Sequence, residues 1–381
     1  MSPNFNPNIA WKHILSLAYP RTVGSSGEKQ AQEYISSALQ GMDYQVEEEE
    51  FALGIAPWHF SRICIILGLS LLGAAWLAAD KFPLAAAVLL GLTLAILAFA
   101  TRFWLWLVEK PQFYRSQLKS GNIIAHIPSA AGQQVFLMAH YDSKSQTISL
   151  PVRIICLGLV FISLGALIII LGLGLALPVW ENICFGLAGL AGLRLAMVET
   201  RNDSPGALDN AASVGILLEL ARIFRQNPPQ GMQLNFIFTG AEEWGLQGAV
   251  NFLRNHAADW DKSNCWFLNL DGVGIAGKLA YVANAAGAGK LLPQIKSAAG
   301  RLNVPLKRMH MFSGLLMDHL PFARHGFATL SLCSVGRSSF CIHTPQDDMA
   351  KVDLQGIDEA GRVVQDYICS AGACPPPNCR G

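Results

Sequence analysis

Four apolar segments interrupt the alternation of hydrophobic and polar positions along this chain. Two of them, Ile63 to Ala79 and Phe82 to Thr101, are uncharged and lie close together. A third, Ile154 to Trp180, is uncharged for 27 residues, and a weaker one runs from Asn182 to Leu193 before Arg194 interrupts it. Since a transmembrane helix needs about 20 mostly apolar residues, these segments predict membrane spans. The alternative for the first pair is a hairpin buried in a soluble core.

Outside these segments, helix-like and strand-like patterns alternate. Apolar residues at spacings of three and four predict helices, and short apolar runs bounded by turn residues predict strands. This alternation predicts an α/β fold with a mostly parallel, twisted sheet flanked by helices on both faces. The predicted elements are a helix at 26–40, an edge strand at 43–50, paired strands at 122–127 and 134–140 around a turn at 128–132, a helix at 210–225, a strand at 234–239, a helix at 245–256, strands at 266–271 and 279–284, a helix at 286–301, a strand at 328–334 and a helix at 353–369.

The composition supports a membrane protein and argues against some partners. Hydrophobic residues make up 52% of the chain and charged residues only 14%, whereas about 25% charged is usual in soluble domains. The net charge is +1 and there is no basic run, so we expect no nucleic acid partner. The nine cysteines include no C-x-x-C pair, so we expect neither a disulfide framework nor a zinc knuckle. We also expect no signal peptide within residues 1–60.

Histidines and carboxylates follow the apolar strands, at the carboxyl ends where a parallel sheet places its chemistry. His140 and Asp271 each end a strand, Glu242-Glu243 follow another, and His343 follows the last one after a loop. Asp209 lies in a turn of small residues that opens into an apolar helix. Each motif alone has an ordinary explanation. An aspartate before a helix is usually an N-cap, and a glutamate pair is often a solvated helix start.

Considered together, these residues predict a site for two zinc ions. Two histidines and three acidic ligands give the mixed nitrogen and oxygen coordination that suits zinc. A bridging carboxylate, here Asp209, allows two ions about 3.5–4 Å apart, an arrangement used for hydrolysis. The Glu242-Glu243 pair can then supply a ligand and the base that takes a proton from water. Asp142 is placed to orient His140 through its second ring nitrogen.

The order H-x-D, D-N, E-E, L-D and H-T resembles the di-zinc aminopeptidase family, which is related to bacterial leucyl aminopeptidases, glutamate carboxypeptidase and glutaminyl cyclases. The resemblance covers residues 20–50, 122–145 and 202–370, including Arg21–Gly27 and the site-shaping stretch Met317–Phe322. It implies a zinc exopeptidase fold, a peptide substrate, Glu242 as general base and acid, and Asp142 as the residue that orients His140. The implied ligands are His140, Asp209 and Asp271 for one zinc ion, and Asp209, Glu243 and His343 for the other.

Two alternatives to an exopeptidase stay open. His140-Tyr141-Asp142-Ser143-Lys144 also resembles glutaminyl cyclases, which work with a single zinc ion. Asp209-Asn210-Ala211-Ala212, Gly245–Gly248 and Ile342-His343-Thr344 resemble the peptidases, so we favour an exopeptidase over a cyclase-like acyltransferase. No arginine cluster for a substrate carboxylate is evident, which favours an aminopeptidase. A non-catalytic membrane receptor or scaffold would be expected to have decayed ligands, and none is decayed.

The predicted organisation is a catalytic domain interrupted by two transmembrane hairpins in a lipid bilayer. If His140 and Asp209 bind the same metal ion, an even number of crossings must separate them, so the weaker apolar segment counts as a span. If the strands at 43–50 and 122–127 share a sheet, an even number of crossings must also separate them, so both apolar segments of the first pair count as spans. The predicted catalytic parts are 1–60, 111–150 and 201–370, the hairpins are 61–110 and 151–200, and a flexible tail covers 371–381.

Charge predicts the membrane side of the catalytic domain. Basic residues at the hairpin ends nearest this domain are Arg62, Arg102, Lys110, Arg153, Arg194 and Arg201, whereas the opposite loops contain only Lys81. The positive-inside rule therefore predicts a cytoplasmic catalytic domain. The sequon Asn202-Asp203-Ser204 would favour the outside, but such matches are common by chance.

Overall fold

The computed structural model describes residues 4–54, 57–110, 117–128, 132–283, 288–310 and 316–371. The chain divides into two compact units. The sheet unit comprises Met1–Gly54, Arg115–Ser145 and Arg201–Gly381, and the helical unit comprises Ile55–Tyr114 and Gln146–Thr200. The predicted tail, from residue 372 onward, and residues 129–131 of the predicted turn lie outside the described residues.

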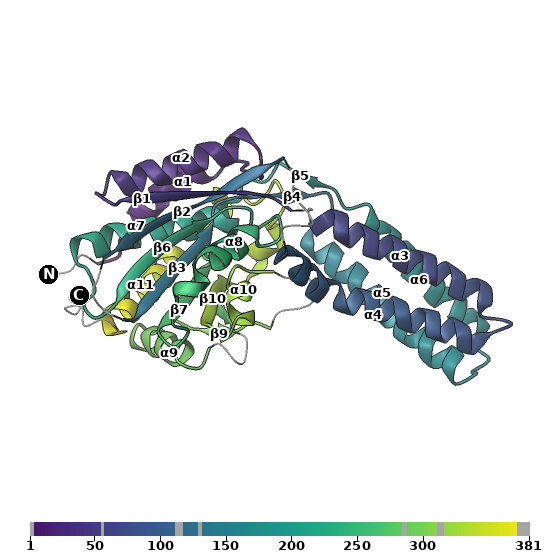
Figure 1. Ribbon diagram of the computed structural model, residues 1–381. Coiled ribbons are helices and arrows are strands. Elements are labelled where there is room, and N and C mark those ends of the chain that lie inside the picture. Colours follow the sequence, from purple (N-terminus) through teal and green to yellow (C-terminus); the bar gives the residue numbers. More distant parts are fainter. Residues whose placement is uncertain are drawn as a thin grey trace. The chain divides into compact units, whose positions relative to one another are not determined.

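The sheet unit is built on a mixed eight-stranded sheet with a parallel centre (Figure 1). The order across the sheet is β1-β2-β6-β3-β7-β10-β8-β9. The central pairs β6–β3, β3–β7 and β7–β10 are parallel, as is β8–β9, whereas β1–β2, β2–β6 and β10–β8 are antiparallel. The strands are β1 Val46–Ala52, β2 Lys119–Ile127, β3 Gln134–His140, β6 Gln233–Thr239, β7 Cys265–Leu270, β8 Leu279–Val282, β9 Lys307–Arg308 and β10 Ala328–Ser334. The predicted α/β class and edge strand are confirmed.

The predicted pairing of the strands at 122–127 and 134–140 is wrong. β6 lies between them, antiparallel to β2 and parallel to β3. The physical reason is visible in β3, where every residue from Val135 to His140 is buried. A strand buried along its length needs hydrogen-bonded neighbours on both edges and cover on both faces. β3 finds these neighbours in β6 and β7, which come later in the chain.

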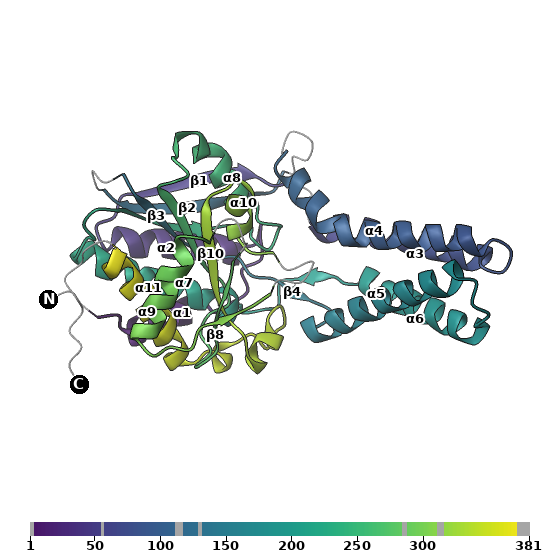
Figure 2. The same cartoon turned by 90° about the horizontal axis from the view of Figure 1, so that it is seen from below.

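Helices cover both faces of the sheet (Figures 1 and 2). Alternate residues of β3 point to opposite faces, so Val135 and Leu137 join one apolar cluster and Phe136 and Met138 join another. The larger cluster includes α1 Pro7–Leu17, α2 Ser26–Gln40, α7 Ala212–Gln226, α9 Leu291–Arg301 and α11 Leu354–Ala371. The smaller one includes α8 Gln247–His256 and α10 His319–Arg324. The five helices predicted for this unit are confirmed, and α1 and α10 were not predicted.

The helix α1 packs closely against α7. Asn6 caps α1 by accepting a hydrogen bond from the backbone of Asn8, and Ala10, Ile14 and Leu17 form its buried face. This face meets α7 at Gly215, where an added Cβ would lie 2.6 Å from Cγ1 of Ile14 and 2.8 Å from the carbonyl oxygen of Ala10. The glycine is therefore needed for the close approach of the two helices.

Replacing Gly215 by alanine is expected to lower the free energy of unfolding by about 1–3 kcal/mol, because the added methyl overpacks this contact. Thermal unfolding of the purified protein measures the effect. The matched control is Gly300→Ala in α9, where no atom lies within 4 Å of the added Cβ. That variant should be neutral or more stable by up to about 1 kcal/mol. Equal unfolding temperatures for the two variants would contradict the close packing of α1 on α7.

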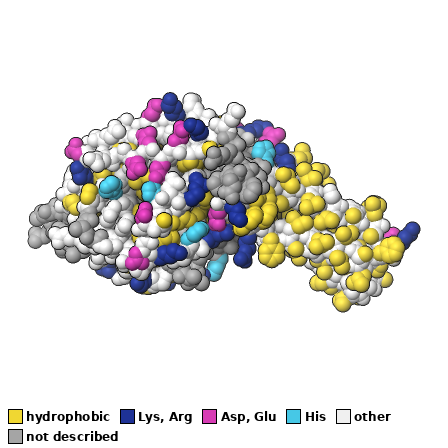
Figure 3. Space-filling view, in the orientation of Figure 1, with side chains coloured by type: hydrophobic (Ala, Val, Ile, Leu, Met, Phe, Trp, Pro, Cys, Tyr) yellow, Lys and Arg dark blue, Asp and Glu magenta, His cyan; other side chains and the backbone are white. Residues whose placement is uncertain are grey.

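The described residues of the helical unit form four helices, and their outward side chains are largely apolar (Figure 3). The four helices are α3 Pro57–Ala78, α4 Pro83–Val108, α5 Leu150–Gly172 and α6 Pro178–Ala196. Among the described helices, α3, α4 and α5 are long and apolar enough to cross a membrane. Only 17% of the apolar window of α3 or of α4 is buried, which contradicts a hairpin inside a soluble core. The predicted fourth span falls on α6, which contains Glu181 and Arg194, so the count of four stays a prediction.

The two ends of the second apolar hairpin lie side by side. The apolar run predicted from Ile154 to Trp180 is broken, because α5 ends at Gly172 and α6 begins at Pro178. Before α5 and after α6, the short strands β4 Ser145–Gln146 and β5 Thr200–Arg201 form a two-stranded ribbon. Next to it, Thr147 and Glu199 exchange two hydrogen bonds of 3.0 Å. The chain therefore leaves and returns at one place.

Candidate metal centre

The predicted ligands come together at the carboxyl ends of the central strands. His140 is the last residue of β3, Glu243 follows β6, and Asp271 follows β7. Asp209 lies in the irregular turn Ala207–Ala211 before α7, and His343 follows a short 3-10 helix at Arg337–Cys341. Loops after parallel strands meet at one edge of the sheet, which explains how residues so far apart in sequence converge.

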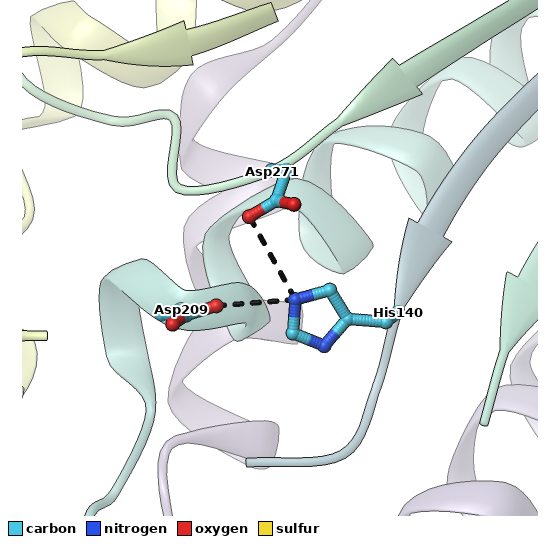
Figure 4. Close-up of side chains that lie close together, drawn as sticks. All are labelled: His140, Asp209 and Asp271. Carbon is cyan, nitrogen blue, oxygen red and sulfur yellow. Dashed lines mark ion pairs between the residues drawn. The ribbon is translucent and has the colours of Figure 1, made fainter. Parts of the chain in front are cut away.

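One group of possible metal ligands consists of His140, Asp209 and Asp271 (Figure 4). The Nε2 atom of His140 lies 3.1 Å from Oδ1 of Asp209 and 3.8 Å from Oδ1 of Asp271. Both carboxylates thus point at the same ring nitrogen from different elements of the fold.

A second group consists of Asp209, Glu243 and His343. The Nε2 atom of His343 lies 3.1 Å from Oδ2 of Asp209 and 2.9 Å from Oε1 of Glu243. Asp209 therefore belongs to both groups and presents a different carboxylate oxygen to each. The ordinary explanation of Asp209 as a helix cap is not observed, because no side chain caps the start of α7.

The donor set fits divalent cations. Nε2 of His140 and Oε1 of Glu243 are buried and make no hydrogen bond with the described residues, and the atoms recorded within ion-pair distance of them are the other candidate ligand atoms. Buried polar atoms normally have a partner, and a cation between these donors would provide one. Burial alone would lower the pKa of His140, but the nearby carboxylates, Glu242 foremost, outweigh burial and raise this pKa. The surroundings of His140 thus favour positive charge, and its imidazole with carboxylates suits zinc.

The pKa values of the two adjacent glutamates are shifted in opposite directions. Burial raises the pKa of Glu242 well above its usual range. Burial would do the same to Glu243, but the charges of His343 and Lys144 hold its pKa at about 2. Neighbouring acids whose pKa values are pushed apart are typical of paired roles. Glu243 therefore stays ionised, as a metal donor has to be, whereas Glu242 is suited to exchange a proton.

Asp142 lies against Nδ1 of His140, the second ring nitrogen. The nearest acceptor to Nδ1 of His140 is the backbone carbonyl of Asp142, at 3.1 Å, and the carboxylate oxygen lies at 3.5 Å. The Asp142 carboxylate instead accepts hydrogen bonds from the backbone N–H groups of Glu242 and Glu243, at 3.1 and 3.0 Å. Asp142 therefore links the His140 strand end to the glutamate turn.

Asp347, which no sequence pattern indicated, makes a similar contact at the turn of Asp209. Its buried carboxylate accepts hydrogen bonds from the backbone N–H groups of Leu208 and Asp209, at 2.8 and 3.1 Å. Asp347 comes four residues after His343, so it links the loop of this histidine to the turn of Asp209. Burial raises the pKa of Asp347 to about 7, and the charge of Asp209 acts in the same direction.

Replacing Asp347 by asparagine is expected to destabilise the protein by about 1–3 kcal/mol, because one buried N–H of the Asp209 turn then faces an amide donor. Zinc affinity should fall with stability, since this turn carries the shared carboxylate. Thermal unfolding and zinc titration of the purified variant measure the two effects. Asp348→Asn is the neighbouring control, because Asp348 caps a short surface helix through Ala350. An Asp347 variant with unchanged zinc affinity would contradict the positioning role.

Lys144 is a second residue whose place the sequence analysis did not predict. Its ammonium group contacts Oε2 of Glu243.

Asp318, from the predicted site-shaping stretch, is buried and accepts a hydrogen bond from Thr239 at the end of β6. Burial raises the pKa of Asp318 to about 7. Neither this position nor that of Lys144 could be derived from spacing, because both depend on how separate loops meet.

A parallel-centred sheet with histidines and carboxylates at its strand ends is an arrangement suited to divalent-metal chemistry. The chain belongs to peptidase family M28, since the model of that family matches residues 122–368, more than half of its length. This match confirms the resemblance stated from the motifs.

Curated relatives include an aminopeptidase and an endoplasmic reticulum metallopeptidase. Aminopeptidase YwaD of Bacillus subtilis is 26% identical over 175 residues, which cover 44% of this chain and 38% of the relative. Endoplasmic reticulum metallopeptidase 1 of Mus musculus is 27% identical over 165 residues, which cover 42% of this chain and 18% of the relative. The matched parts span less than half the length of either relative. A vacuolar membrane protease of Schizosaccharomyces japonicus is 41% identical over 73 residues, which cover 19% of this chain and 8% of the relative. The comparisons therefore support a metallopeptidase family with membrane members.

Solved structures show the same fold at low identity. A zinc aminopeptidase from Bacillus subtilis has a TM-score of 0.60 at 16% identity, covering 97% of this chain and 96% of that chain. A glutaminyl cyclase from Porphyromonas gingivalis has a TM-score of 0.57 at 17% identity, covering 96% and 99%. The fold is therefore common to both functions that the motifs left open, and only the site can distinguish them.

Proposed function

We propose that this protein is a membrane-bound exopeptidase with two zinc ions, and specifically an aminopeptidase. The observation that carries the proposal is the sharing of Asp209 between two ligand groups. His140, Asp209 and Asp271 would hold one ion, and Asp209, Glu243 and His343 the other. A single-zinc enzyme would have no use for a second complete ligand set. For this reason the proposal favours a peptidase over a glutaminyl cyclase-like acyltransferase or a non-catalytic receptor.

Zinc bound at these groups supplies a Lewis acid and lowers the pKa of water. Glu242 would accept the proton of the attacking water and return it to the leaving amine, a role that suits a carboxylate of raised pKa. Asp142 and Asp347 hold the ligand turns through backbone hydrogen bonds. The side chains of Glu242 and Asp318 are buried near His140, and acidic rather than basic neighbours of the ligands favour a substrate with a free amino terminus.

The test is a pair of assays on the detergent-purified protein. Release of an aminoacyl-anilide is measured with and without a zinc chelator, and an N-terminal glutaminyl peptide is offered for cyclisation. The proposal expects chelator-sensitive release that returns on adding zinc. Cyclisation without release would establish the acyltransferase instead, and the absence of both reactions in zinc-loaded protein would support the receptor.

We further propose four membrane spans with the catalytic domain in the cytoplasm. The ribbon of β4 and β5 and the bonds between Thr147 and Glu199 support an even number of crossings in the second hairpin. The basic residues at the hairpin ends support the cytoplasmic side. In sealed vesicles with the cytoplasmic face outward, added protease should remove a C-terminal tag. Protection of the tag, or glycosylation at Asn202, would place the domain on the other side.

A further inference from the structure

The two oxygens of the Glu243 carboxylate face different neighbours, Lys144 and His343. The Lys144 ammonium contacts Oε2, whereas Nε2 of His343 lies 2.9 Å from Oε1 of the same carboxylate. The side chains of Lys144 and Glu243 are only 15% and 5% exposed. Water therefore screens this ion pair poorly, and only one oxygen of Glu243 is left for the group that it forms with Asp209 and His343.

Among the described residues, no lysine or arginine is recorded in an ion pair with Asp271, the carboxylate that belongs to the other group alone. The charge of the buried Arg21 acts on Asp209, which both groups share. The ion pairs of Asp209 and Asp271 recorded among the described residues join them to histidines only. Both groups share Asp209 and each contains one histidine, so their chemical difference is concentrated at Lys144. An ammonium this close to a ligand oxygen repels a divalent cation.

Lys144 could instead strengthen the second group by holding Glu243 in place. That contribution is small, because the backbone of Glu243 is already held by the carboxylate of Asp142, at 3.0 Å, and its side chain is buried. Repulsion and the loss of one ligand oxygen therefore outweigh orientation.

We propose that Lys144 makes the group of Asp209, Glu243 and His343 the weaker of the two zinc sites, so that its ion exchanges while the ion at His140 is retained. This inference rests on the proposed two-zinc function. Lys144 is a positioning residue here, because it acts through Glu243. The consequence is an enzyme whose loading with the second ion follows the free zinc concentration.

The test is a stepwise zinc titration of the full-length, metal-depleted protein against a chromophoric chelator. In the native protein, two unequal binding steps are expected. Lys144→Met keeps the aliphatic stem and removes the charge, so it should tighten the weaker step by about tenfold or more, because the repulsion between the ammonium and the metal ion is removed. Lys144→Arg keeps the charge and should retain the weak step. The stronger step should be unchanged in both variants, which also shows that they are folded.

An unchanged or weakened second step in Lys144→Met would overturn the inference, as would equal behaviour of the methionine and arginine variants. Lys144→Gln provides a second neutral variant if the methionine variant loses the stronger step. Failure of the peptidase proposal is seen separately, as the absence of chelator-sensitive aminoacyl-anilide release by the native protein.

Discussion

Asp209→Asn is expected to lose both zinc ions and, with them, peptidase activity. Asp209 is the one residue common to both ligand groups, with Oδ1 facing His140 and Oδ2 facing His343. An amide keeps the size of the side chain but removes its charge and one acceptor oxygen. Zinc affinity at each group should fall by more than about 100-fold, since even partners of metal ligands change affinity 10–100-fold.

Metal analysis and zinc titration of the purified variants measure this effect. The matched comparison is Asp271→Asn, because Asp271 belongs only to the group of His140. The Asp271 variant should lose about one equivalent of zinc, and the Asp209 variant about two. If the Asp209→Asn variant contains as much zinc as the Asp271→Asn variant, or more, the assignment of Asp209 as the bridging ligand is wrong. A loss of folding is recognised by circular dichroism before metal is measured.

Glu242→Gln is expected to lower kcat by about 10²–10⁴-fold, the usual contribution of a general acid and base. Glu242 is buried beside the ligands and has a raised pKa, but it is a member of neither ligand group. The zinc content should therefore stay at the native level. Rates of aminoacyl-anilide release and metal analysis of the same samples provide both readouts.

Glu243→Gln is the control for this prediction, because it changes the neighbouring residue by the same single atom. Glu243 belongs to the second ligand group, and its pKa of about 2 keeps it ionised. This variant should lose zinc, whereas the Glu242 variant should lose rate alone. Full turnover by Glu242→Gln would exclude it as the base, and exchanged results would mean that the two roles are reversed.

The five ligands could be predicted because the sequence carries their positions locally. Each follows an apolar strand or opens a helix, and the carboxyl ends of parallel strands share one edge of the sheet. His140 at the end of β3 and Asp271 after β7 meet for this reason. The number of zinc ions and their actual binding remain predictions.

The neighbours of the ligands could not be predicted in the same way. Strand order is set by which buried edges complete one another, so β6 separates β2 from β3 although it comes about a hundred residues later. Asp347 and Lys144 lie on loops, where an acid or a lysine is normally a solvated surface residue. Only the meeting of separate loops gives Asp347 two backbone donors and Lys144 a carboxylate.

The ribbon of β4 and β5 makes the second hairpin a separable module. Its two ends already lie together, as the bonds between Thr147 and Glu199 show, so inserting or removing the hairpin changes little in the path of the sheet unit. Closing a loop whose ends are adjacent has an entropy cost that grows only slowly with length. The second hairpin could thus be removed by joining residues 145 and 201 through a short linker, which would leave the first hairpin, α3 and α4, in place.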